Sequence, residues 1–213
     1  PQSCCRFALE QTDITPPPNI YHRMWGAAKH DRATGIHRRL RASVILLEPM
    51  DGREQQFLIA LDHCVMGRQE MDKLVDAVST GAEIQRDALI VVFSHTHAAG
   101  LMSLERKNLP GGDLISPYLD ELSVRIIDLV KKAKENIQPV TILYGTGHCN
   151  LAANRDFWDE DNQLWACGYN PGTSADDTVL TARIHSQDHS LLATLVNYAC
   201  HPTIMGPENR MIT

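Results

Sequence analysis

Two apolar runs in the sequence each lead into histidine, and these histidines are the side chains best suited to chemistry. In VVFSHTH, His95 and His97 are two positions apart, and in LVNYACHPT, His201 follows a second apolar run. Residues at positions i and i+2 of an extended segment point to the same side. If the two runs are neighbouring strands, their ends bring the three imidazoles into the crevice where open α/β sheets bind ligands.

Imidazole nitrogen is a good ligand for zinc, which takes about four ligands at about 2.0 to 2.1 Å from nitrogen. A catalytic zinc keeps a position for water, lowers the pKa of that water to about 7 and polarises the carbonyl under attack. The sequence therefore predicts a Zn²⁺ site that hydrolyses an amide or an ester. A lone His-x-His pair occurs often by chance, so the position of these histidines after two apolar runs is what favours a metal site over a structural role.

Two other zinc folds also use His-x-His, and the sequence argues against both. In the metallo-β-lactamase fold the motif continues into an Asp and a further His, whereas here His97 is followed by Ala98, Ala99 and Gly100. The amidohydrolase barrels need a complete ring of strand and helix units, for which 213 residues are too few.

The pattern before the first motif predicts a hairpin, a helix and a strand. The apolar runs 41–47 and 56–61 are separated by MDGRE, whose Asp-Gly is a turn signal. Residues 69–80 carry apolar side chains at helical spacing and are followed by Gly81, which we expect to be the C-cap. The continuous apolar run 88–93 predicts a strand that is buried on both faces.

After the motif, a long helix is expected, because residues 116–136 have acidic residues early and lysines late, which suits the helix dipole. Strands are expected at 140–144, 178–184 and 191–199, and the polar and aromatic stretch 150–174 is expected to be a loop. Residues 13–40 show no periodicity and predict an irregular surface segment. This alternation predicts one α/β domain over 1–213, with a mixed β-sheet sandwiched by helices.

Composition narrows the class of protein. Hydrophobic residues make up 43% and charged residues 22%, as in soluble globular proteins. A net charge of −6 with scattered Lys and Arg argues against a nucleic-acid partner. No stretch approaches the ~18 apolar residues of a transmembrane segment, and no signal peptide is visible at the start. The six cysteines include no Cys-x-x-Cys pair; a disulfide remains open, but Cys64 and Cys200 lie in apolar runs and are interpreted as small buried hydrophobes.

Four blocks of the sequence resemble the amino-terminal catalytic domain of the neutral, or alkaline non-lysosomal, ceramidases. They occur in the family's order and span nearly the whole chain from Asp13 onward: DITPPP with TGIHRRLRAS, then FSHTHAAGL, then YGTGHCNLAANRD, then LVNYACHPTIMGPENRMIT. The last two blocks are the most specific, since Asn-Arg after a glycine-rich turn and Asn-x-x-x-His-Pro-Thr rarely occur together by chance.

The resemblance implies a role for four residues. His95 and His201 would be zinc ligands, and His97 would contact the attacking water or the scissile amide as a general base or orienting group. Arg155, in the Asn-Arg block, would face the substrate carbonyl and stabilise charge on its oxygen. The implied reaction converts ceramide, a lipid-like amide, into sphingosine and a fatty acid, in a secreted or periplasmic protein.

The resemblance also marks what this stretch does not contain. The family completes its zinc shell with a Glu and a Tyr, and places a serine near the reacting centre, all from a later part of the chain. We therefore expect the catalytic domain to be cut short here, so that the remaining ligands come from further sequence or a companion chain. Where the best-known ceramidases have Ser-Gly-Pro-Gly-Gly after His-Thr-His, this chain reads Ala-Ala-Gly-Leu. A zinc esterase or amidase with a non-sphingolipid substrate, or a non-catalytic fragment or scaffold, therefore remain alternatives.

Overall fold

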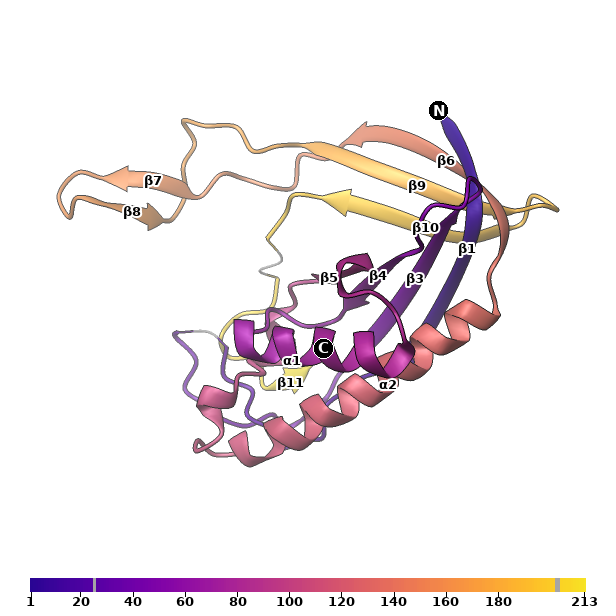
Figure 1. Cartoon of the computed structure of the whole chain (residues 1–213). Helices are drawn as coiled ribbons and strands as arrows, with labels where there is room; N and C mark the ends of the chain where they lie inside the picture. The colour runs from indigo at the N-terminus through magenta and orange to yellow at the C-terminus, as the bar shows by residue number, and fades with distance from the viewer. Residues whose placement is uncertain (25, 202–203) are drawn as a thin grey trace. The chain divides into compact units, whose positions relative to one another are not determined.

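The computed structural model describes residues 1–24, 26–201 and 204–213 (Figure 1). Contacts between residues divide the chain into two compact units. The unit called here the strand unit comprises Pro1–Ser3 and Val140–His201. The core unit comprises Cys4–Pro139 and Pro202–Thr213 and holds the main cluster of buried apolar side chains.

The core unit is built on a mixed sheet, which confirms the α/β fold class expected from the sequence. Its strands lie in the order β1 (Gln2–Asp13), β3 (Arg41–Pro49), β4 (Gln56–Leu61) and β5 (Leu89–Phe93). The pairs β1–β3 and β3–β4 are antiparallel, so the predicted hairpin is confirmed. The pair β4–β5 is parallel.

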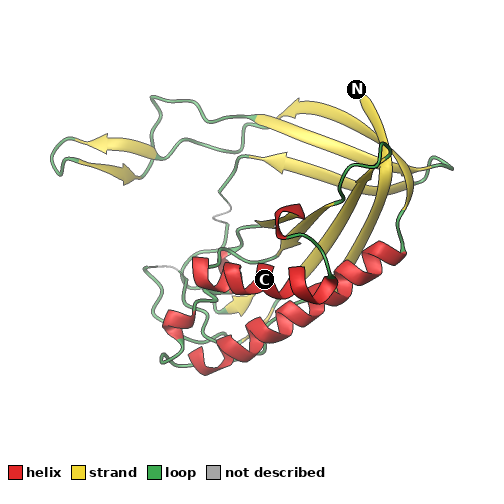
Figure 2. Ribbon diagram, in the orientation of Figure 1, coloured by secondary structure: helices red, strands yellow, loops and turns green. Residues whose placement is uncertain are grey.

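Two α-helices, α1 (Arg68–Ala82) and α2 (Ile115–Glu135), lie on the same side of this sheet (Figure 2). Residues of β3 such as Val44 and Leu46 are completely buried. On β5, however, Ile90 is 51% exposed and Val92 is 40% exposed. The prediction that this strand is buried on both faces is therefore wrong, because β5 is the last strand in the order and the helices cover one face only. Among the described residues, no helix is both long and apolar enough to cross a membrane.

The helix predicted over 116–136 is confirmed by α2, but the end predicted for the first helix is wrong. Helix α1 continues through Gly81 to Ala82, and Glu83 caps it in the left-handed conformation with φ 54°. A Cβ atom on Gly81 would lie 2.6 Å from Cδ1 of Ile127 on α2. Gly81 therefore allows α1 and α2 to pack closely, and it does not end the helix.

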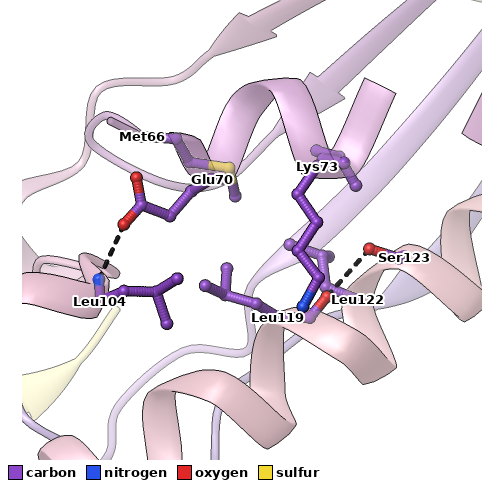
Figure 3. Close-up of a pocket in the computed structure, with 8 residues that line it drawn as sticks. Met66, Glu70, Lys73, Leu104, Leu119, Leu122 and Ser123 are labelled. Carbon is purple, nitrogen blue, oxygen red and sulfur yellow. Dashed lines mark hydrogen bonds between the residues drawn. The ribbon is translucent and has the colours of Figure 1, made fainter. Parts of the chain in front are cut away.

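The contact between the helices leaves one small cavity, shown with its lining side chains in Figure 3. Its volume of about 10 Å³ corresponds to a single water, too small for a substrate. At its edge, Oε1 of Glu70 accepts a hydrogen bond of 2.7 Å from the backbone N–H of Leu104. This bond ties the segment that follows His97 to the first turn of α1.

A buried histidine fixes the loop that follows β4. The ring of His63 is fully buried, and its Nε2 lies 2.5 Å from the hydroxyl of Tyr118. That hydroxyl donates to the carbonyl of Ile14 at 2.7 Å, so Nε2 of His63 is the donor in its bond to Tyr118. Burial lowers the pKa of His63 to about 4.

The long segment between β1 and β3 is largely irregular, as expected. It contains one isolated bridge between Tyr21 and Arg32, and the short strand β2 (Gly35–Ile36), which pairs in parallel with β11 (Met211–Ile212). Single turns of 3₁₀ helix complete the core unit: η1 (Arg86–Ala88), η2 (His97–Ala99), η3 (Leu104–Arg106) and η4 (Gly112–Leu114).

The strand unit contains three antiparallel strands in the order β10 (Leu191–Tyr198), β9 (Thr178–Ser186) and β6 (Gln138–His148). All three were expected, although β6 is longer than predicted. The stretch 150–174, expected to be a loop, contains the hairpin β7 (Asp156–Asp159) and β8 (Leu164–Cys167). Its turn contains no Gly of the kind that signals a short hairpin. Instead, the carboxylate of Asp159 stabilises the turn by accepting hydrogen bonds from the backbone N–H groups of Asp161 and Asn162.

The packing on α2 predicts a contrast between two nearby positions. Leu122 is fully buried in the core, so Leu122→Ala should lower the free energy of unfolding by about 2 to 5 kcal/mol through lost burial and a cavity. Val124 on the same helix is 57% exposed, so Val124→Ala should change it by less than about 0.5 kcal/mol. Denaturation followed by circular dichroism measures both, and equal effects would contradict the core assigned here.

His63 should make the protein less stable in mild acid. Its pKa is about 4 in the folded chain, below the ordinary histidine value of 6.5, so the unfolded chain binds the extra proton first. Stability should therefore fall as the pH drops below 6.5, by about 2 kcal/mol from this group between pH 7 and pH 5. Urea denaturation at both pH values should show a smaller acid loss for His63→Gln than for the unaltered protein, and an equal loss would show that His63 titrates normally.

Candidate functional site

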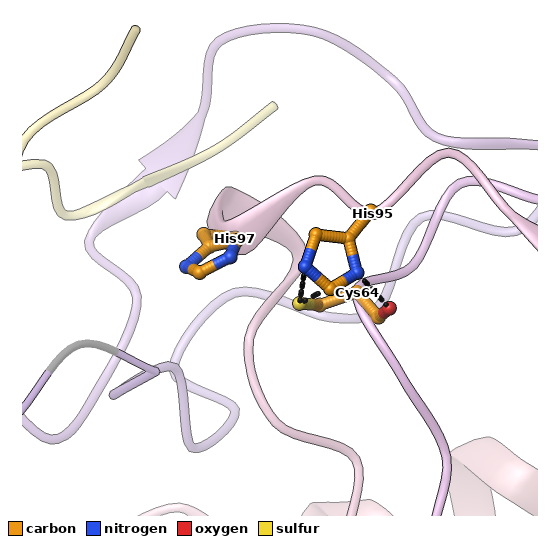
Figure 4. Close-up of side chains that lie close together, drawn as sticks. All are labelled: Cys64, His95 and His97. Carbon is orange, nitrogen blue, oxygen red and sulfur yellow. Dashed lines mark hydrogen bonds between the residues drawn. The ribbon is translucent and has the colours of Figure 1, made fainter. Parts of the chain in front are cut away.

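The parallel pair β4–β5 brings the loops that follow both strands to one edge of the core sheet. Leu61, the last residue of β4, is paired with Phe93, the last residue of β5. The backbone N–H of Ser94 then donates a hydrogen bond to the carbonyl of Leu61 at 3.0 Å, so the segments that follow the two strands leave the sheet side by side. As a result Cys64, three residues beyond β4, lies beside His95, two residues beyond β5 (Figure 4).

The backbone of Cys64 orients the ring of His95. Nδ1 of His95 lies 2.9 Å from the carbonyl oxygen of Cys64. A carbonyl only accepts hydrogen bonds, so Nδ1 carries the ring hydrogen and Nε2 of the neutral ring carries the lone pair. The Cys64 sulfur lies 3.7 Å from Nδ1 and 3.8 Å from Nε2. The ring is thus held in the tautomer that can bind a metal through Nε2.

His95 adopts a backbone conformation that is unusual for a side chain of its size. Its φ is 58°, in the left-handed region. Such a residue costs on the order of 1 to 3 kcal/mol, and residues of this kind concentrate at functional sites. The strain turns the chain sharply after β5 and directs the imidazole toward Cys64.

His97 lies next to His95, as the His-x-His spacing predicted. The two ring centroids are 5.1 Å apart and the ring planes are inclined by 73°. His97 begins the 3₁₀ turn η2, and the carbonyl of Ala98 in that turn accepts a hydrogen bond of 2.9 Å from Nε2 of buried His22. Nδ1 of His22 then accepts from Nε2 of His30 at 3.0 Å. Burial, the largest effect, lowers the pKa of His22 and favours its neutral form. The hydrogen-bonded pair of His22 and His30 thus anchors the turn η2 through the carbonyl of Ala98.

Cys64 completes a group that could hold a metal ion. Ligand atoms of Cys64, His95 and His97 all lie within 4.8 Å of one another. Thiolate sulfur and imidazole nitrogen are both zinc ligands. Sequence reasoning interpreted Cys64 only as a small buried hydrophobe; it is buried, and burial raises the pKa of its thiol to about 11. The missed signal was that Cys64 follows the strand that pairs in parallel with the strand before His95.

A pocket of about 500 Å³ adjoins His97. One part of its wall is polar and includes Asp62, whose Oδ2 accepts from the backbone N–H of Arg41 at 2.9 Å. Another part is apolar and includes Leu40 and Met205. A volume of this size falls within the range of small-molecule binding sites.

The strand unit brings together the other two residues singled out from the sequence. Nη2 of Arg155 donates a hydrogen bond to Nδ1 of His201. The backbone carbonyl of Arg155 accepts from the N–H of Gly168 at 2.6 Å, which fixes the chain at the base of the β7–β8 hairpin. The residues that follow His201 in the His-Pro-Thr motif, Pro202 and Thr203, lie outside the described residues.

The four predicted site residues therefore form two pairs, one in each unit. His95 and His97 lie with Cys64 in the core unit, and Arg155 lies with His201 in the strand unit. That both pairs serve one metal ion stays a prediction.

The fold is shared with solved ceramidases. The neutral ceramidase from Pseudomonas aeruginosa superposes with a TM-score of 0.77 at 17% sequence identity, over 98% of this chain and 34% of that chain. A ceramidase structure described as complexed with C2 gives a TM-score of 0.76 at 17% identity, over 98% of this chain and 33% of that one. The chain thus spans about a third of the length of these proteins. No curated protein matches the sequence significantly.

The sequence itself matches a family model over almost its whole length. Residues 7–213 match the model described as neutral/alkaline non-lysosomal ceramidase, N-terminal. This family is generally metal-dependent, which agrees with a Cys64, His95 and His97 group able to hold an ion. The chain belongs to the neutral/alkaline non-lysosomal ceramidase family.

Proposed function

We propose that this chain is the amino-terminal part of a zinc-dependent hydrolase that cleaves the N-acyl amide bond of a lipid-like substrate, with ceramide as the substrate suggested by the family. The observation that carries the proposal is the cluster of Cys64, His95 and His97 at the edge of the sheet, in a chain that belongs to a ceramidase family. Residues 1–213 would then be one partial catalytic domain.

His95 and His201 are the proposed protein ligands of the zinc from this chain. His95 would bind through Nε2, because its Nδ1 donates to the carbonyl of Cys64. Once bound, the zinc would activate a water for attack and polarise the substrate carbonyl.

The hydrogen bond between Arg155 and His201 has a consequence for this site. Because Nδ1 of His201 accepts from Arg155, the neutral ring carries its hydrogen on Nε2. Binding a metal through Nε2 requires the ring hydrogen to be on Nδ1 instead. Two donors, the Nδ1–H of His201 and an N–H of Arg155, would then face each other and could not form a hydrogen bond. We therefore expect Arg155 to release His201 when the metal binds, which would free its guanidinium for the substrate.

His97 and Arg155 are the proposed catalytic residues. His97, at the wall of the pocket, would accept a proton from the attacking water and return it to the leaving nitrogen. Arg155 would donate an N–H to the carbonyl oxygen, where negative charge develops in the transition state.

The remaining zinc ligands implied by the resemblance, a Glu and a Tyr, would come from sequence beyond these residues or from a companion chain. The solved ceramidases are about three times as long as this stretch, which supports a larger catalytic domain. The alternatives remain a zinc esterase or amidase with a non-sphingolipid substrate, and a non-catalytic scaffold. Zinc content and turnover of ceramide against simpler acyl amides and esters separate them.

Removing His95 should abolish metal binding. In the protein with its natural termini, we expect His95→Ala to lose both bound zinc and hydrolysis of a short-chain ceramide, because a direct ligand is gone. The matched control is His189→Asn, since His189 lies in the β9–β10 turn with φ 67°, which asparagine tolerates. Metal analysis after dialysis measures the effect, and equal zinc in the two variants would count against His95 as a ligand.

Arg155→Ala should separate metal binding from catalysis. We expect zinc to be retained and kcat to fall by roughly 10²-fold or more, as when an oxyanion donor is removed. Arg53→Ala, in the exposed turn between β3 and β4, is the control and should leave kcat unchanged. An unaltered kcat in Arg155→Ala would remove this residue from the mechanism, whereas loss of zinc would show that it acts through His201.

A further inference from the structure

The β7–β8 hairpin carries large aromatic side chains that its own fold does not bury. Trp158 and Trp165 are directly opposite each other on the two strands, with ring centroids 5.8 Å apart in an edge-to-face arrangement. Trp165 remains 72% exposed, and Tyr169, just beyond the hairpin, is equally exposed. This pair stabilises the hairpin by cross-strand contact, but Trp158 also stays 40% exposed, so much of the aromatic surface of the pair is in water.

The second face of the hairpin also carries apolar side chains, beside the carboxylate of Asp159. Side chains alternate between the faces of a strand, so Phe157 and Leu164 point away from the tryptophan pair. Leu164 is 48% exposed, and Phe157 lies over Gly168, where an added Cβ would be 2.7 Å from its ring. A protein partner that packed on one face would leave the other in water. A lipid layer that surrounds the hairpin would cover both of its faces.

The charge of this region is strongly negative. Between Asp156 and Ala182 the sequence contains six acidic residues and no Lys or Arg. Three of the acids, Asp159, Glu160 and Asp161, lie at the hairpin tip, and the whole chain carries a net charge of −6. Anionic lipid surfaces would repel such a tip.

We propose that the β7–β8 hairpin inserts into the headgroup layer of a zwitterionic, choline-bearing lipid surface. Tryptophan and tyrosine favour this layer because their rings combine an apolar body with a polar edge. The tip carboxylates complement the quaternary ammonium of choline, and the tryptophan faces bind the same group through cation–π contact. Asp and Glu are depleted in the cores of protein interfaces, which favours lipid over a protein partner.

The position of the hairpin, directly after Arg155, would link lipid binding to the candidate site. Strand β7 begins at the residue after Arg155, and the N–H of Gly168 closes the hairpin base on the carbonyl of Arg155. A docked hairpin would therefore hold the candidate catalytic arginine at the lipid surface from which a lipid-like substrate is taken. Docking itself does not depend on the proposed zinc chemistry, because vesicle binding is measured without turnover.

The test uses the protein with its natural termini and vesicles of pure phosphatidylcholine. We expect flotation with the vesicles and a blue shift of tryptophan fluorescence, and weaker binding when phosphatidylglycerol is mixed in. Trp165→Ala should weaken partitioning by about tenfold, since an exposed indole loses its apolar contact with the lipid. The control Val124→Ala, an exposed side chain on α2, should bind like the unaltered protein.

A charge reversal gives a second measurement that does not remove an aromatic ring. The double variant Glu160→Lys with Asp161→Lys should prefer vesicles that contain phosphatidylglycerol, the reverse of the unaltered protein. No binding to phosphatidylcholine, undiminished binding by Trp165→Ala, or an initial preference for anionic vesicles would each overturn the proposal. So would protection of Trp158 and Trp165 from acrylamide quenching without lipid, because protein would then already cover the hairpin.

Discussion

The candidate site depends on the parallel pairing of β4 and β5. Antiparallel neighbours would send the segments after the two strands to opposite ends of the sheet, whereas parallel neighbours release them at the same end. This single constraint places Cys64 beside His95 although 31 residues separate them. Helix α1 and the turn η1 supply the connection that parallel strands require.

Hydrogen bonds from deeper in the core unit then hold the emerging loops. Buried His63, the residue before Cys64, is fixed by its hydrogen bond to Tyr118, and His22 holds the carbonyl of Ala98 next to His97. Glu70 holds the segment further along through Leu104. Each of these groups is buried and bonded to the backbone or to a buried hydroxyl, which is how a rigid scaffold keeps catalytic side chains in place. The site residues can then be polar and strained because their neighbours are not free to move.

The sequence predicted those features whose cause is local. The charge pattern and apolar period of α2 and the Asp-Gly turn before β4 identified these elements, and the His-x-His spacing correctly placed His95 beside His97. Features that depend on a distant partner were missed. Gly81 resembles a helix end until Ile127 of the other helix is seen against it, and Cys64 resembles a core residue until the parallel partner of β4 is known. The pairing of Trp158 with Trp165 likewise needed the hairpin register.

The left-handed backbone of His95 bears on how this position trades stability against activity. Glycine or asparagine would relax the strain at a φ of 58°, so a chain selected for folding alone would be expected to carry one of them here. If His95 binds the metal as proposed, its imidazole would mark a place where the protein tolerates a weaker fold in order to keep a chemical group. On that proposal, a relative without the metal site would gain stability by replacing this one residue.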